Sequence, residues 1–155
     1  MEGKLLIYGV EAQILFDPKS THSFLSPMFA KMIAMTFKEL DYLLTVTTPV
    51  RKRVVCRTYY PSCSVLLGEV SLPADLIILD MHDFDVILGM DWLEKYHATM
   101  DCFSRTITFK LKGDQADFLI QGKRKKKQVG IISALKAGKL VQSGCEAFLR
   151  KLPVH

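Results

Sequence analysis

Short apolar runs with a period of two, separated by turn residues, fill the chain up to residue 111 and constrain its fold more than any other feature. Two apolar runs, residues 4–10 and 12–16, meet at the stretch Gly9-Val10-Glu11, which predicts a β-hairpin. Three more hairpins are predicted from paired runs: 40–47 with 54–59, 62–67 with 70–79, and 99–103 with 106–111. Many short strands joined by short turns favour an all-β, mainly antiparallel sandwich or barrel.

Helical segments are few. Ser26 before Pro27 is typical of a helix start, because Ser caps the helix and Pro fits its first position. Residues 91–97 and 133–142 are the other two predicted helices. The strand pattern ends near residue 112, so we expect one domain over residues 1–112. Residues 113–155 are then a basic linker and a helical connector.

The chain has 155 residues, of which 49% are hydrophobic and 24% charged, as in globular proteins. Its net charge of +5 comes from one run, because 16 of the 21 Lys and Arg lie elsewhere and match 16 acids. The run consists of Lys123, Arg124, Lys125, Lys126 and Lys127. We interpret it as a solvated linker. Weak, nonspecific binding of nucleic-acid phosphates and a nuclear-localisation signal are the alternatives.

No apolar run approaches the roughly 20 residues of a membrane-spanning helix, so no membrane partner is expected. The four cysteines form no C-x-x-C pair, and no His stands at zinc-finger spacing to them. We therefore predict no metal and no cofactor. Without a recognisable signal peptide, a cytoplasmic location with reduced thiols is the default expectation.

Asp17 follows an apolar run and begins a polar turn, residues 17–23. An acid at the end of a buried strand is displayed on a tight loop in a desolvated setting. By itself this segment is typical of the start of an ordinary turn, in which the Asp side chain accepts hydrogen bonds from backbone amides. Further along the chain, the apolar residues Ile87 and Leu88 run into Gly89 and a predicted helix.

Taken together, the segments ILFDPKSTHSF and DFDVILGMDWL closely resemble the retropepsin-like aspartic protease of plant gypsy-class retrotransposon polyproteins. The resemblance implies an acid-protease barrel with short helices and Asp17 as the catalytic acid. It places Pro18, Lys19, Ser20 and Thr21 in the active loop, and Ile87, Leu88 and Gly89 beside that loop as its support. It makes Thr48, Pro49, Val50 and Arg51 the flap.

Peptide hydrolysis by carboxylates requires two of them, close enough to share one proton. Only one Asp in this chain sits in such a turn, and the chain shows no internal duplication. A working site would need Asp17 from two protomers on a two-fold axis, which implies a homodimer. The substrate would be an extended polypeptide of the chain's own polyprotein, paired as an added strand.

Lys19 departs from the family pattern, which has Gly two residues after the Asp. Lys adds bulk where backbone must approach the substrate, and its positive charge works against a single shared proton. Three functions therefore stay open. The chain is an aspartic endopeptidase impaired by Lys19, an inactive dimerisation or peptide-binding module of the same fold, or a nucleic-acid-associated segment of a structural polyprotein.

Overall fold

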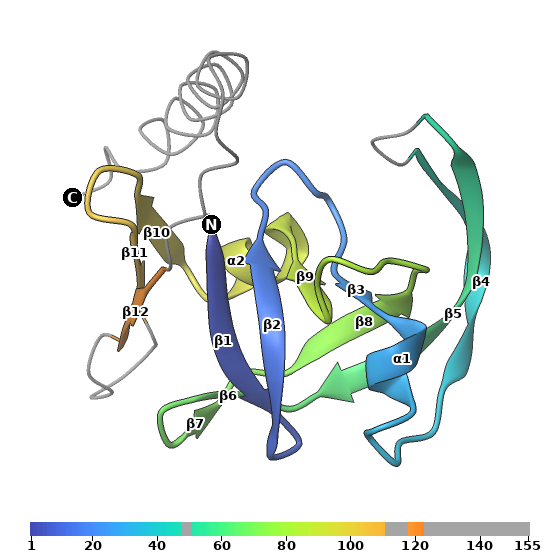
Figure 1. Cartoon of the computed structure of the whole chain (residues 1–155), viewed down its shortest axis with the longest axis horizontal. Helices are drawn as coiled ribbons and strands as arrows, with labels where there is room; N and C mark the ends of the chain where they lie inside the picture. Colours follow the sequence, from blue (N-terminus) through green and yellow to red (C-terminus); the bar gives the residue numbers. More distant parts are fainter. Residues whose placement is uncertain (48–50, 111–117, 123–155) are drawn as a thin grey trace.

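The computed structural model describes residues 1–47, 51–110 and 118–122 (Figure 1). It is mainly β-structure with mostly antiparallel pairing, as predicted, arranged in one nine-stranded and one three-stranded sheet. In chain order the elements are β1 (Glu2–Ile7), β2 (Val10–Phe16), β3 (Phe24–Leu25), α1 (Pro27–Ala30), β4 (Lys38–Thr47), β5 (Arg53–Cys63), β6 (Val65–Leu67), β7 (Val70–Ser71), β8 (Ala74–Ile78), β9 (Val86–Leu88), α2 (Met90–Lys95), β10 (Ala98–Asp101), β11 (Thr106–Phe109) and β12 (Phe118–Gln121).

The predicted first hairpin is confirmed, with β1 and β2 antiparallel from Glu2↔Leu15 to Ile7↔Val10. Tyr8 and Gly9 form its two-residue turn with φ values of 49° and 77°, the positive values that match the twist of the strands. Alternate residues of both strands point inward, and Ile14 and Phe16 are completely buried. The period of two in the sequence therefore fixes which face of this hairpin forms the core.

Strands β2, β9 and β3 lie side by side in the order β3-β9-β2 and bring distant segments together. β9 runs parallel to β2, with Phe16 opposite Leu88, and antiparallel to β3. β3 also pairs in parallel with β8. This crossing arrangement places the residues that follow β2 next to those that follow β9.

The second hairpin, β4–β5, is confirmed and is longer than predicted. It projects as an arm from one side of the molecule (Figure 1), and its pairing runs from Lys38↔Tyr59 to Thr47↔Arg53. The register shifts between Glu39 and Leu44, so residues 40–43 of β4 face the single residue Arg57 of β5. The arm carries its own apolar cluster, in which Leu44, Val46 and Val54 pack with residues of β3, β8 and β9.

The third predicted hairpin is wrong in part. β6 pairs with β7 only at Leu66↔Ser71 and Leu67↔Val70, and the chain then leaves for β8, which pairs with β5 and β3. Pro73 separates β7 from β8, and its missing N–H prevents a continuous strand over 70–79.

The fourth hairpin is confirmed as β10–β11, with a turn over residues 102–105 that is longer than the expected two residues. Asp101 Oδ1 accepts hydrogen bonds from the backbone N–H groups of Phe103 and Ser104, at 2.9 and 3.2 Å. These bonds, that of Ser104 foremost, lower the pKa of Asp101. A charged Asp side chain thus fixes the longer turn.

The division of the chain at residue 112 stays a prediction, but the sheet reaches beyond it. β12 pairs with β11 from Thr106↔Gln121 to Phe109↔Phe118. Ile120 is only 8% exposed and belongs to the main core cluster. The apolar residues in the predicted linker are therefore a strand of the three-stranded sheet.

Two of the three predicted helices fall within the described residues, and both are short. Ser26 caps α1 as expected, with its Oγ accepting a hydrogen bond from Phe29 N at 3.1 Å. α2 follows Gly89, and its Trp92 is buried against Phe16 and Phe109. The predicted helix over 133–142 lies outside the described residues. Neither described helix is long and apolar enough to span a membrane.

The cysteines agree with the sequence-based expectation only in part. Cys56 and Cys63 are buried free thiols. Cys102 takes part in a disulfide, so the expectation of reduced thiols is wrong for that residue.

Shortening the buried side chain of β12 tests whether this strand belongs to the folded domain. We expect Ile120→Ala in the full chain to lower the free energy of unfolding by about 2 to 5 kcal/mol, because it removes core volume. Phe103→Ala is the matched control, since Phe103 is 98% exposed, and it should change stability by less than about 0.5 kcal/mol. Urea unfolding measures both. Equal stability of the two variants would show that β12 contributes nothing to the core.

Candidate active site

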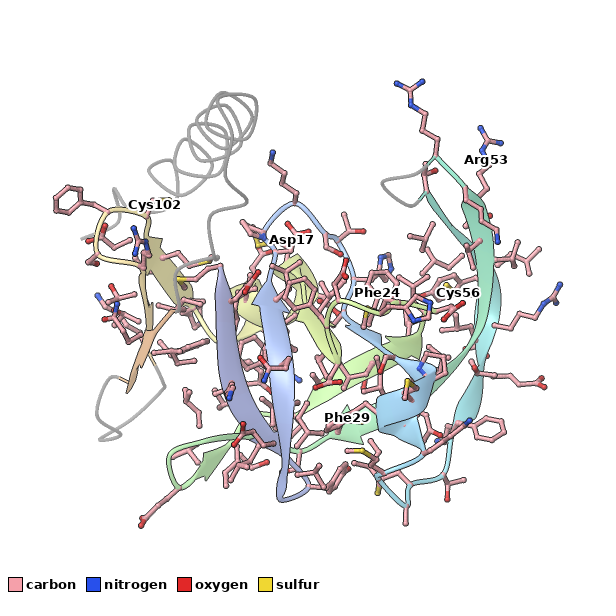
Figure 2. All side chains as sticks on the ribbon, viewed as in Figure 1. Asp17, Phe24, Phe29, Arg53, Cys56 and Cys102 are labelled. Carbon is pink, nitrogen blue, oxygen red and sulfur yellow. The ribbon has the colours of Figure 1, made fainter. Side chains whose placement is uncertain are left out.

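Asp17 stands at the end of β2, where the chain turns out of the core (Figure 2). Its backbone N–H donates to the Leu88 carbonyl at 3.0 Å, which extends the parallel β2–β9 pairing by one step. The residue before it, Phe16, is completely buried, whereas Asp17 is partly exposed. The carboxylate is therefore anchored through rigid backbone at the boundary between core and surface.

The loop after Asp17 is closed by its own hydrogen bonds. Lys19 N donates to Asp17 Oδ1 at 3.0 Å, and Ser20 N donates to the Asp17 carbonyl at 3.1 Å. Ser20 Oγ donates to the His22 carbonyl at 2.7 Å. Thr21 Oγ1 lies 2.8 Å from His22 Nδ1. The hydrogen bond from Lys19 N holds the Asp17 carboxylate in its orientation, and the other contacts fix the loop around it.

Gly89 packs directly against this loop. A Cβ atom at residue 89 would collide with the His22 carbonyl and would lie 2.6 Å from the Ser20 carbonyl oxygen. The next residue, Met90, donates its N–H to the Ser20 carbonyl at 2.7 Å. The structure thus brings together the two segments that the sequence analysis singled out, and glycine is the only residue that fits at this contact.

Ser23 is a further residue of the site that the sequence analysis did not identify. It is completely buried, and its Oγ accepts a hydrogen bond from Gly89 N at 3.0 Å and donates one to Asp91 Oδ1 at 2.7 Å. Asp91 Oδ1 also accepts from Trp92 N at 2.9 Å, at the start of α2. The available signal was a small hydroxyl residue directly before the buried pair Phe24 and Leu25.

Lys19 occupies the loop without backbone strain. Lys19 is not one of the described residues with a positive φ, so its backbone does not need the left-handed conformation that favours glycine. Its backbone N–H is the one bound to Asp17 Oδ1, a bond that any residue other than proline supplies. The side chain is exposed. The effect of Lys19 is thus confined to the volume and charge of its side chain.

Of the predicted flap, Thr48, Pro49 and Val50 lie outside the described residues. Arg51 is described and is exposed, with a positive φ of 59°. Below it, the inner side of the β4–β5 arm packs through Val46 and Val54 into the cluster that holds Phe24 and Ile87. The arm is therefore joined to the strands that carry the loop and Gly89.

The two buried free thiols of the described residues offer little chemistry. Burial raises the pKa of the Cys63 thiol to about 12, and the nearby Asp75 carboxylate adds to the shift. Burial also raises the pKa of Cys56. Both thiols stay protonated at neutral pH and supply no thiolate nucleophile. The described part of the chain also holds no group of three or more His, Cys, Asp or Glu that could hold a metal ion.

Comparison with known proteins gives one family and one fold. The sequence profile of the retroviral aspartyl protease family matches residues 1–115. Among solved structures, the chain is similar to the retroviral protease-like domain of Ddi1 from Leishmania major, with a TM-score of 0.58 and 14% sequence identity. The match covers 83% of this chain and 97% of that domain. No curated protein sequence matches the chain.

Adding a methyl group at the loop contact tests the packing of Gly89. We expect Gly89→Ala to lower the free energy of unfolding by about 3 kcal/mol or more, because two backbone carbonyls must move. Gly9→Ala is the control, since its Cβ would meet nothing within 4 Å and only its positive φ opposes the change. That variant should cost about 1 kcal/mol. Thermal unfolding of both variants makes the comparison, and a smaller loss for Gly89→Ala would contradict the packing.

Removing the Ser23 hydroxyl tests the buried network. Ser23→Ala leaves the Gly89 N–H without its acceptor and should lower the free energy of unfolding by about 1 to 3 kcal/mol. Ser64→Ala is matched to it, because that hydroxyl pairs with Ser71 at an exposed position. We expect the control to lose less than about 0.5 kcal/mol in urea unfolding. If the two losses are equal, the network has no special importance for the loop.

Proposed function

The chain belongs to the retroviral aspartyl protease family, and on that basis we propose that it is an aspartic endopeptidase domain of a retrotransposon polyprotein, active as a homodimer. The observation that carries the proposal is the position of Asp17. Its backbone N–H donates a hydrogen bond to Leu88 of β9, and its carboxylate accepts one from Lys19 N. Gly89 packs directly against the same loop. Such a loop holds a carboxylate ready for contact with a symmetry-related copy.

In the proposed dimer, the Asp17 carboxylates of two protomers meet and share one proton, since two like charges at close range cannot both persist. The ionised carboxylate takes a proton from a water molecule as that water attacks the peptide carbonyl. The protonated carboxyl donates to the carbonyl oxygen. The tetrahedral intermediate then breaks at the C–N bond, with a proton passing to the leaving amine.

The proposed substrate is an extended segment of the chain's own polyprotein, lying between the β4–β5 arm and the active loop. Backbone pairing with a hairpin gives affinity with little dependence on sequence. The inner side of the arm offers apolar contacts through Leu44, Val46 and Val54, beside Ile87. We therefore expect apolar side chains close to the cleaved bond.

Lys19 supports the second candidate, a module of the same fold that dimerises or binds peptides without cutting them. Lys19 puts a long, charged side chain in each active loop where the family pattern has Gly, which crowds the approach of the substrate backbone. The proposed weak binding of nucleic acid through residues 123–127 lies outside the described residues. The retrotransposon origin and the cytoplasmic location also remain proposals.

A peptide-cleavage assay at acid pH separates the two candidates. We expect weak or absent cleavage by the chain as written, and a gain of at least ~10-fold for Lys19→Gly, equivalent to ~1.4 kcal/mol of barrier. Lys19→Met removes the charge and keeps the bulk, so it should give a smaller gain in rate than Lys19→Gly. Mass spectrometry of a peptide mixture provides the readout.

Asp17→Asn, introduced together with Lys19→Gly, must abolish the gain. Glu94→Gln on α2 is the control for loss of an exposed carboxylate, and it should leave cleavage unchanged. If the unaltered chain cleaves peptides efficiently, and Asp17→Asn abolishes this cleavage while Lys19→Gly leaves it unchanged, Lys19 does not impair catalysis. A dimer in sedimentation with no cleavage by any variant would favour the inactive module.

A further inference from the structure

Charge is distributed unevenly over the described residues. The β4–β5 arm, residues 38–63, holds five Lys and Arg against two acids, a net charge of +3. The other described residues hold six Lys and Arg against eleven acids, a net charge of −5. A polyanion is therefore attracted to the arm and repelled by the rest of the described domain.

The positive charge of the arm gathers at its free end, in three successive residues that we call the basic tip: Arg51, Lys52 and Arg53. All three side chains are exposed. Neither arginine forms an ion pair with a carboxylate of the described residues. The arginines are thus available for an external anion.

Strand alternation turns Arg53, the residue of the basic tip that belongs to β5, away from the active loop. Val54 and Cys56 belong to the inner apolar cluster, so Arg53 and Val55 belong to the opposite face of β5. Val55 is 47% exposed, as an outer residue should be. Figure 2 shows Arg53 near the free end of the arm, on the far side from Asp17. The outer face is therefore separate from the proposed substrate side.

An aromatic ring lies lower on the same arm. Tyr42, which is 52% exposed, lines a hollow of about 240 Å³ together with Arg57. Glu39 and Asp41 line the same hollow, so phosphates are expected at the tip and not at the base. Guanidinium groups that bind phosphates, on the same hairpin as a ring on which bases can stack, favour single-stranded nucleic acid over an acidic peptide.

From this combination we propose that the outer face of the β4–β5 arm binds single-stranded RNA through its phosphates, with the basic tip as the main contact and Tyr42 as a stacking residue. The binding is independent of sequence and sensitive to salt, as for other phosphate contacts. It overlaps the predicted flap at Arg51, but it uses neither Asp17 nor the active loop.

The test measures fluorescence anisotropy of a labelled 20-nucleotide single-stranded RNA, using the full chain with residues 123–127 changed to Gln. We expect Arg51→Gln with Arg53→Gln to weaken binding at least 10-fold at 50 mM KCl. The slope of log affinity against log salt should become shallower by about 1.4, at roughly 0.7 per lost phosphate contact on a single strand. Tyr42→Leu should weaken RNA binding about fivefold or more and leave binding of polyglutamate unchanged.

Lys31→Gln with Lys95→Gln is the matched control, because it removes the same charge from exposed positions on or beside the two helices. It should change RNA affinity by less than about twofold. If the control pair loses as much RNA affinity as the arginine pair, the effect depends on net charge alone and the proposal is overturned. No loss for the arginine pair would overturn it too. If polyglutamate displaces the labelled RNA as well as unlabelled RNA of equal charge does, the partner is an acidic protein, and the proposal is overturned.

Discussion

The contact of Gly89 with the loop after Asp17 is the constraint on which the rest of the site depends. Here one main chain lies directly against the carbonyl groups of another, at Ser20 and His22, with no space for a side chain. A contact of this kind fixes the loop far more rigidly than side-chain packing, because backbone cannot change rotamer. The hydrogen bond from Met90 N to the Ser20 carbonyl then holds the same two segments together.

This contact also connects the loop to the core. Ser23 joins the Gly89 amide to Asp91 at the start of α2, and α2 carries Trp92 into the aromatic group with Phe16 and Phe109. The position of Asp17 is therefore set by the main core on one side and by a buried hydroxyl on the other. A change far from Asp17 that loosens α2 is transmitted to the loop through Ser23.

How much could be predicted from the sequence follows from the range of the interactions. The β1–β2 hairpin and the Ser26 cap depend on neighbouring residues, so local patterns identified them. The break at Pro73 was misinterpreted because the apolar run continues on both sides of it, and only the pairing of β8 with β3 and β5 separates the two strands. Ser23 offered only the signal of a small hydroxyl residue before a buried pair, which is not specific, because the value of its hydroxyl depends on partners 66 and 68 residues away.

The register shift in β4 has a consequence for solubility. β4 is one of the two edge strands of the nine-stranded sheet and is ten residues long, and such an edge offers unpaired backbone groups to any other strand. Residues 40–43, which face Arg57 alone, interrupt that edge, and Lys38, Glu39 and Asp41 add charge along it. The bulge thus protects the chain against edge-to-edge aggregation while leaving the arm its length.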